Sequence, residues 1–174
     1  MIRSKEEAYK LLEKLDAPSR LIKHVKLVDE AAQILIRECE FLNVTFDKFL
    51  VEVGVAIHDA GKILHPNELN EKGSEHEPAG EKLMLANGAT PEQARCCVSH
   101  ARYSEMEVSL EELLVALSDK LWKGKRVESL ELEVIDRVAQ SLSKDRWDLF
   151  AQLDSCFEKI ASEGDGRLNR SVDA

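Results

Sequence analysis

The sequence is poor in the residues that shape turns and strands. Its 174 residues include only 8 glycines and 4 prolines, and aromatic residues make up 5% of the chain. Glycine and proline are abundant where a chain turns often, and aromatic residues are enriched in strands. Their scarcity argues against a sheet-based fold and favours a mostly helical chain. At this length we expect one domain with a hydrophobic core of its own.

Cysteines and long apolar runs are equally sparse. The four cysteines show no CxxC spacing and no dense disulfide framework, so we expect reduced, mostly buried thiols at Cys39, Cys96, Cys97 and Cys156. No stretch approaches the roughly 18 apolar residues that a membrane span needs. The first residues lack the apolar core of a signal peptide. Together these absences predict a cytoplasmic protein that does not enter a membrane.

Positive charge is also in deficit. Lysine and arginine number 24 against 33 acidic residues, which gives a formal net charge of −9 at pH 7. A long nucleic acid is therefore a poor partner, because affinity for it comes mainly from neutralised phosphates. A small phosphate ester stays compatible with this balance if basic residues are concentrated in one pocket.

Helix signals recur along almost the whole chain. Apolar residues follow helical spacing, and capping patterns begin at Ser4, Ser74, Thr90 and Ser109. Gly61 fits the glycine that ends a helix. We predict an all-α, single-domain bundle with an N-terminal helix in residues 1–17, a core in 18–126, C-terminal helices in 127–163 that pack on the core, and a mobile tail in 164–174.

Most histidines occur where solvation alone would not place them. His24 lies on the apolar face of its predicted helix, and the His58-Asp59 doublet ends the apolar run 51–57. Asp119 follows the apolar segment 113–117, where an unpaired carboxylate would be costly to bury. A divalent metal ion would satisfy these groups, since it binds neutral imidazole and ionised carboxylate. The candidate metal ligands are His24, His58, Asp59, His76, His100 and Asp119.

The ordered pattern H…HD…H…H…D resembles the HD-domain superfamily of metal-dependent phosphohydrolases over roughly residues 18–126. The segment AIHDAGK matches the doublet, and ALSDKLWKGKR matches the closing aspartate. The resemblance implies a bundle of the HD-domain type and one or two divalent ions per chain, as Fe, Mn, Co, Mg, Ni or Zn. It assigns one ion to His24, His58, Asp59 and Asp119. In members that have both middle histidines, here His76 and His100, a second ion is bound and the doublet aspartate bridges the two.

The stretch from His76 to His100 resembles, in particular, bacterial HD hydrolases that split diadenosine tetraphosphate. The shared residues are His76, Gly80, Gly88, Ala94 and His100. After His100 the chain reads Ala-Arg-Tyr-Ser instead of the threonine-glycine run of that group, so this departure leaves the substrate open. The resemblance implies hydrolysis of a small phosphorylated substrate, expected to be a nucleotide, by metal-activated hydroxide, with Asp59 as a catalytic residue.

Basic residues cluster next to two of the candidate ligands. Lys62 follows Asp59 by three positions, and segment 120–126 holds four of the 24 basic residues. In an acidic chain, such a concentration favours phosphate binding. We expect Lys62 to serve catalysis and substrate binding, and Lys120 and Arg126 to contact the substrate.

Two other functions stay open at this point. Some proteins that resemble the superfamily use the same ligands around two irons and act as oxygenases. The ligand set cannot separate them from hydrolases, because both need open positions on the metals. A non-catalytic HD binding module is the third alternative, although its degenerate forms usually lose the ligands that are intact here. A homodimer also stays open as the assembly.

Overall fold

The computed structural model describes residues 1–172, and within them it contains helices and no strand. The predicted all-α single-domain bundle is confirmed. The helices are α1 (Lys5–Lys14), α2 (Ser19–Phe41), α3 (Lys48–Ile57), η1 (Ala60–Ile63), η2 (Pro66–Leu69), α4 (His76–Ala86), α5 (Pro91–Arg102), η3 (Tyr103–Glu105), α6 (Leu110–Leu121), α7 (Glu128–Ser141), α8 (Arg146–Ser162) and α9 (Gly164–Val172).

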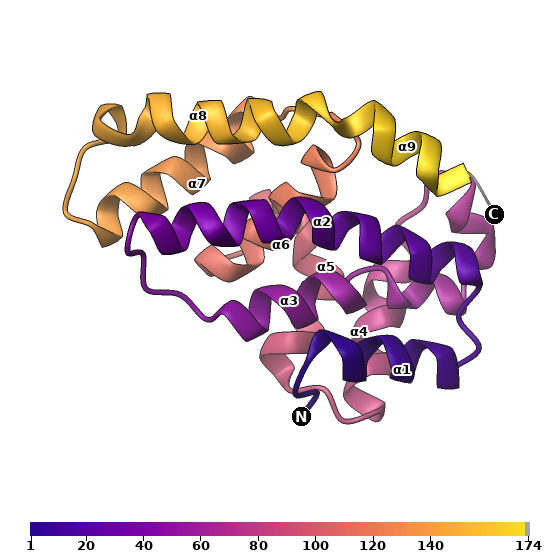
Figure 1. Cartoon of the computed structure of the whole chain (residues 1–174). Coiled ribbons are helices and arrows are strands. Elements are labelled where there is room, and N and C mark those ends of the chain that lie inside the picture. The colour runs from indigo at the N-terminus through magenta and orange to yellow at the C-terminus, as the bar shows by residue number, and fades with distance from the viewer. Residues whose placement is uncertain (173–174) are drawn as a thin grey trace.

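Helix α2 crosses the middle of the molecule and joins its two hydrophobic clusters (Figure 1). One cluster packs α6, α7 and α8 against α2 and α3. The other packs α1, α4 and α5 against the first turns of α2 and against the face of α3 that the first cluster does not use. Because α2 and α3 contribute to both clusters, side chains near their ends are held from two sides. Each of the six candidate metal ligands lies on or beside one of the packed helices.

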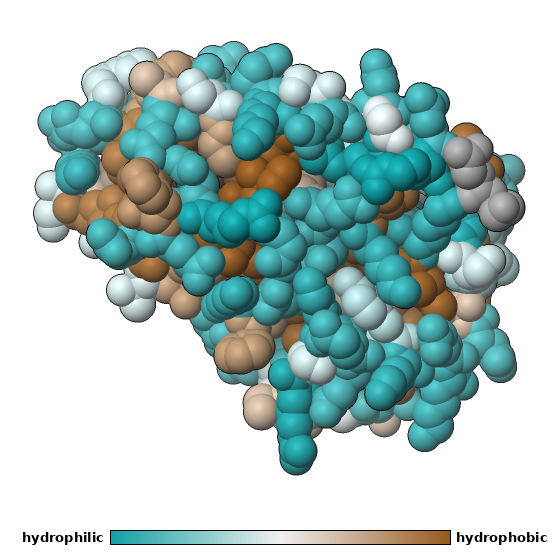
Figure 2. All heavy atoms as spheres, in the orientation of Figure 1, coloured by the Kyte–Doolittle hydropathy of each residue, from teal (hydrophilic) through white to brown (hydrophobic). Residues whose placement is uncertain are grey.

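Apolar side chains are directed inward, and the face shown in Figure 2 is mostly hydrophilic with scattered apolar patches. None of the helices in residues 1–172 is long and apolar enough to cross a bilayer. The four cysteines are buried and unpaired, as the sequence predicts.

Local signals define some helix ends, and tertiary contacts override others. Thr90 and Ser109 form complete capping boxes with Gln93 and Glu112, as predicted. The capping box expected at Ser74 is absent, and α4 begins at His76 without a side-chain cap. The Glu77 carboxylate that would complete that box instead accepts a hydrogen bond from Arg102 Nε at 2.6 Å.

Gly61 has a different role from the predicted helix cap. It lies in η1, and a Cβ atom there would stand 1.8 Å from the carbonyl oxygen of His76. A Cβ atom on Gly80 would stand 2.9 Å from the nitrogen of Gly61. The two glycines therefore allow η1 to touch α4. This contact brings Asp59, which precedes η1, next to His76.

The mobile tail predicted for residues 164–174 is wrong for residues 164–172, which form α9. Arg167 in this helix is only 2% exposed, and its guanidinium donates to the carbonyl oxygens of Trp122 and Ile160. Contacts distant in sequence therefore hold α9 in place. The remaining two residues of the predicted tail lie outside the described part of the chain.

We expect Glu112 to make stability depend on pH through the start of α6, the helix that carries Asp119. Burial alone would raise the pKa of Glu112, but hydrogen bonds from the backbone nitrogen of Ser109 and from Arg95 Nε outweigh it and lower the pKa below its ordinary 4.5. A depressed folded-state pKa contributes stability that is present above the unfolded value and lost as pH falls through the folded value. Glu112→Gln should cost about 1–2 kcal/mol at pH 7.

Urea unfolding of wild type and Glu112→Gln at pH 7 and near pH 3 tests this expectation, and the difference should shrink toward zero at the lower pH. Glu105→Gln is the control, because Glu105 is exposed and its carboxylate has no ion-pair partner in residues 1–172. A difference that persists unchanged at low pH would show that the charge of Glu112 is not responsible.

Candidate metal centre

The structure brings the six candidate ligands together at the ends of five helices. His24 lies in the second turn of α2, His58 caps the end of α3, and Asp59 directly precedes η1. His76 is the first residue of α4, while His100 and Asp119 lie in the last turns of α5 and α6. Helix ends converge here because the two hydrophobic clusters pack the bodies of these helices side by side.

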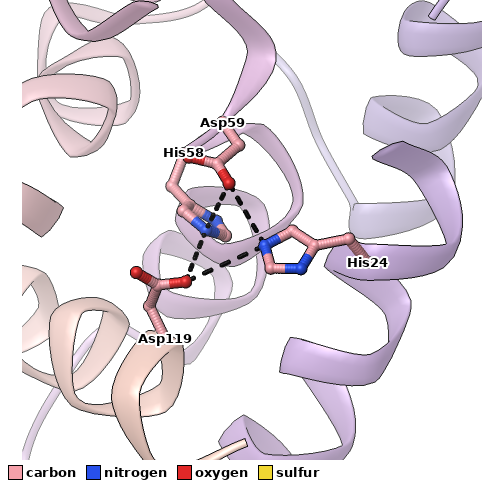
Figure 3. Close-up of side chains that lie close together, drawn as sticks. All are labelled: His24, His58, Asp59 and Asp119. Atoms are coloured by element: carbon pink, nitrogen blue, oxygen red, sulfur yellow. Dashed lines mark hydrogen bonds and ion pairs between the residues drawn. The ribbon is translucent and has the colours of Figure 1, made fainter. Parts of the chain in front are cut away.

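The first donor set consists of His24, His58, Asp59 and Asp119 (Figure 3). His24 Nε2 lies 3.1 Å from Asp59 Oδ2 and 3.8 Å from Asp119 Oδ1. His58 Nε2 lies 3.2 Å from the same oxygen of Asp119. One donor atom from each of the four residues lies within 4.8 Å of all the others. Such spacing matches atoms arranged around a common centre at coordination-bond lengths of about 2.0–2.2 Å.

The second donor set consists of Asp59, His76 and His100, all buried. His76 Nε2 and His100 Nε2 lie 3.3 and 3.4 Å from Asp59 Oδ1. The first set uses the other oxygen of the same carboxylate, since Oδ2 faces His24 and His58. Asp59 thus presents one oxygen to each set and is the residue that the sets share.

Three imidazoles use Nδ1 to bind a neighbouring oxygen, which directs Nε2 into the site. His58 Nδ1 lies 2.6 Å from the carbonyl oxygen of Val55, and His100 Nδ1 lies 3.0 Å from that of Cys96. His76 Nδ1 lies 2.6 Å from Glu68 Oε1. Each acceptor requires the hydrogen on Nδ1, so the neutral ring presents a lone pair at Nε2.

These lone pairs face carboxylate oxygens, and two acceptors in contact need a cation between them. The Nε2 atoms of His24 and His76 are buried and make no hydrogen bond of acceptable geometry, although carboxylate oxygens lie nearby. Buried polar atoms rarely lack a partner. Neutral imidazole with ionised carboxylate is the donor chemistry of divalent transition-metal sites. The residues therefore fit divalent metal ions.

Charges within the site are strongly coupled. Burial opposes protonation of His58, but the carboxylates of Asp59 and Asp119 outweigh it and raise the pKa of His58 to about 9. Burial alone would raise the pKa of Asp59 and Asp119, yet the facing imidazoles hold both pKa values well below the ordinary 3.8. The carboxylates of the site therefore stabilise positive charge, whether metal ions or protons on the imidazoles provide it.

Both donor sets open into a cavity of about 400 Å³. Its lining includes three glutamates, Glu68, Glu71 and Glu77, and four lysines, Lys62, Lys72, Lys120 and Lys123. Lys62 Nζ lies 3.0 Å from Asp59 Oδ2. Lys120 and Lys123 make no ion pair with any carboxylate in residues 1–172. Their charge is available to an anion that enters the cavity.

Arg126 is not at the cavity, which corrects its predicted role as a substrate contact. Its guanidinium binds Glu131 and Asp154 at 2.6 Å and Glu158 at 2.7 Å. The chain turns at Gly124, whose φ of 84° is in the left-handed region, and this turn directs Arg126 toward α7 and α8. Of the basic segment, Lys120 and Lys123 are the lysines that face the site.

Two residues at the site escaped the sequence analysis. Glu68 is 6% exposed and contacts both the backbone nitrogen and Nδ1 of His76. Trp122 lines the cavity and packs edge-on against His24, with ring centroids 4.9 Å apart. Glu68 lies in a polar segment that resembles a solvated loop. No pattern in the sequence links it to His76.

The cysteine thiols and a third group of possible metal ligands are weaker candidates for a functional site. Burial raises the pKa of the Cys96 thiol to about 12, which does not suit a nucleophile. His65, Glu68 and Glu75 also lie close enough to share an ion. However, Glu68 is already bound by His76, and Glu75 has a 77% exposed side chain.

Comparison with known proteins agrees with this geometry. Residues 21–123, more than half of the chain, match the family model described as the HD domain. The matched segment includes all six ligands and ends within the basic segment that follows Asp119. No curated protein and no solved structure matches the chain. The ordered ligands, the helical bundle and the family match lead to one conclusion, that the chain belongs to the HD domain family.

Proposed function

We propose that this protein is a metal-dependent phosphohydrolase that cleaves a small phosphate ester or anhydride, with a nucleotide as the preferred kind of substrate. The HD domain places the chain in a superfamily of metal-dependent hydrolases. One observation carries the proposal furthest. Imidazole Nε2 atoms with their hydrogen fixed on Nδ1 face the buried carboxylate of Asp59 and the half-buried carboxylate of Asp119, in a cavity that four lysines help to line.

We further propose that two ions bind, one at each donor set. The two oxygens of Asp59 support this arrangement, because Oδ2 faces His24 at 3.1 Å and Oδ1 faces His76 at 3.3 Å. When bound, a pair of divalent ions lowers the pKa of a water molecule and neutralises phosphoryl oxygens. The ion identity is open among Fe, Mn, Co, Mg, Ni and Zn.

The lysines supply the anion-binding part of the site. Lys62 Nζ contacts the shared carboxylate and therefore stands directly beside the donor sets. Partial desolvation and repulsion from Lys120, Lys125 and Lys62 lower the pKa of Lys123, although Asp119 opposes the shift. An entering phosphate would relieve this repulsion. Hydrogen bonds from the ammonium groups would also hold the phosphoryl oxygens as charge develops on them.

The cavity also restricts the size of the substrate. A volume of about 400 Å³ is in the range of pockets for small molecules. The acidic surface of the chain, at a net charge of −9, is a poor track for a long polyanion. A small phosphorylated molecule with its phosphate toward the lysines suits both features.

We expect Lys62→Ala and Lys120→Ala each to lower kcat/KM about ten- to a hundredfold while metal content stays at or above the wild-type level. Loss of one charge-assisted hydrogen bond costs about 1.5–3 kcal/mol, which corresponds to this range. Metal binding should survive, because removal of Lys62 frees Asp59 Oδ2 from a competing cation. Lys144→Ala is the control, since Lys144 is an exposed lysine in the turn between α7 and α8.

The assay is phosphate release from mononucleotides, nucleoside diphosphates and dinucleotides with Mn, Co, Fe or Mg added, in air and without oxygen. Release that persists anaerobically and falls in both lysine variants supports the phosphohydrolase. Turnover that requires oxygen and releases phosphate from no ester would assign the site to an oxygenase. A metal-loaded protein that turns over nothing in either atmosphere would favour a binding module.

A further inference from the structure

Helix α9 lies outside the matched HD domain yet reaches the elements that carry the first donor set. It follows α8 and runs beside the first half of α2, as Figure 1 shows. The HD domain match ends at residue 123, and α9 begins at Gly164. Its contacts include the turn after α6, which follows Asp119.

Arg167 makes the principal contact from α9. Its side chain is 2% exposed, and Nη1 donates to the carbonyl oxygens of Trp122 at 3.1 Å and Ile160 at 2.8 Å. A buried guanidinium is costly unless its donors are satisfied. Its acidic partner, Glu163, lies 3.4 Å away and is largely exposed. The backbone carbonyl of Trp122 is therefore a main part of what keeps this charge buried.

Glycine-to-glycine packing fixes the same turn. A Cβ atom on Gly164 would lie 2.4 Å from the nitrogen of Gly124, so the start of α9 fits only against a bare backbone. Gly124 itself has a φ of 84°, which favours glycine. The α6–α7 turn and α9 are thus locked together at two points, through Arg167 and through Gly164.

Trp122 connects the packing of α9 on the α6–α7 turn to a candidate metal ligand. Its indole packs edge-on against His24, with centroids 4.9 Å apart and an interplanar angle of 81°. His24 is the candidate ligand whose Nε2 lacks a hydrogen-bond partner and for which no oxygen partner fixes Nδ1 in residues 1–172. The His58 ring lies 5.7 Å from the His24 ring, and the closer ring of Trp122 therefore contributes to the orientation of His24.

An ion pair also joins α9 to α2, the helix that carries His24. Arg170 binds Glu30 of α2 through two parallel contacts of 2.8 Å. Helix α9 therefore spans α2, which carries His24, and the end of α6, which carries Asp119. By contrast, His76 and His100 of the second set lie on α4 and α5, with which Arg167 and Arg170 form no hydrogen bond or ion pair in residues 1–172.

We propose that Arg167 is a positioning residue for the first donor set, acting through the Trp122 backbone to hold the indole against His24. This inference rests on the proposed metal-binding function. It predicts that loss of Arg167 weakens ion binding at the first set and leaves the second set intact. Outer contacts that orient a ligand typically change metal affinity by about 10–100-fold.

The experiment uses Trp122 as its own reporter in the full chain with Trp147→Phe, which removes the other, exposed tryptophan. In this background, Arg167→Met should shift Trp122 emission in the metal-free protein and weaken Co²⁺ binding, followed by quenching of that emission, about tenfold. Arg146→Met is the matched control. It removes an arginine that forms an ion pair with Asp136 and lies over the ring at position 147, far in sequence from Trp122, and both readouts should stay at the background values.

Gly164→Ala provides a second variant that keeps the buried arginine and displaces α9 from Gly124, and it should change both readouts in the same direction. Circular dichroism selects the temperatures at which each variant is folded. Folded Arg167→Met or Gly164→Ala with unchanged emission and unchanged Co²⁺ affinity would overturn the inference. If the parent protein binds no Co²⁺, the proposed function fails, and the metal-free emission still tests whether Arg167 positions Trp122.

Discussion

Asp59→Ala is expected to remove metal from both donor sets and to lower turnover on the order of a thousandfold. The shared carboxylate contributes Oδ2 to the set of His24 and Oδ1 to the set of His76. A bound ion contributes several kcal/mol of transition-state charge stabilisation, and each 1.36 kcal/mol is a factor of ten in rate. His76→Ala removes a ligand from one set only, so its effect should be smaller.

Metal content by elemental analysis and circular dichroism of the same samples distinguish loss of the site from loss of the fold. The fold should persist in Asp59→Ala, because Asp119 still compensates positive charge on His58. Asp136→Ala serves as the control, since Asp136 pairs with Arg146 on the C-terminal helices. Full metal occupancy with normal turnover in Asp59→Ala would contradict the shared-ligand arrangement.

The sequence predicts structure correctly where residues close together in the chain determine it, as at some helix ends. The capping boxes at Thr90 and Ser109 are closed by residues three positions later, so the sequence contains the whole motif. Candidate ligands were also recognisable, because a histidine or aspartate within an apolar helix needs a partner. The pattern indicated which residues needed one, whereas the shared role of Asp59 was implied only by the resemblance to the HD-domain superfamily.

Predictions from the sequence were wrong where a residue distant in sequence binds a side chain or packs over a segment. Glu77 pairs with Arg102 instead of capping α4, and Arg126 is neutralised by three carboxylates of α7 and α8. Likewise, the glycines at the start of α9 led to the prediction of a mobile tail, whereas in the structure Gly164 packs against Gly124. None of these contacts has a sequence signal, because the partners are brought together only by the packing of the bundle.

Glu68 is expected to control the second donor set selectively. Its carboxylate lies 2.6 Å from His76 Nδ1 and also accepts from the His76 backbone nitrogen at 3.2 Å, so it fixes both the ring and its hydrogen. The bond to His76 lowers the pKa of Glu68, which keeps the acceptor ionised. A carboxylate on the outer nitrogen orients a ligating imidazole and raises its basicity.

Glu68→Ala should therefore weaken ion binding at Asp59, His76 and His100 about 10–100-fold, while binding at the first set remains. Glu68→Gln keeps an acceptor for Nδ1 without the charge and should fall between wild type and Glu68→Ala. Calorimetric titration with Mn²⁺ measures both affinities, and nitrogen NMR of the metal-free protein reports which ring nitrogen of His76 carries the hydrogen.

Glu75→Gln is the matched control for this prediction, because Glu75 is a nearby carboxylate that contacts His65 instead of His76. Gly73→Ala offers an independent approach, since its Cβ atom would stand 2.5 Å from Glu68 Cδ and displace the carboxylate without removing it. If Glu68→Ala and Gly73→Ala left the His76 hydrogen on Nδ1 and both affinities unchanged, the carboxylate would only fill space. A loss confined to the second set in both variants would instead identify Glu68 as the residue that makes His76 a ligand.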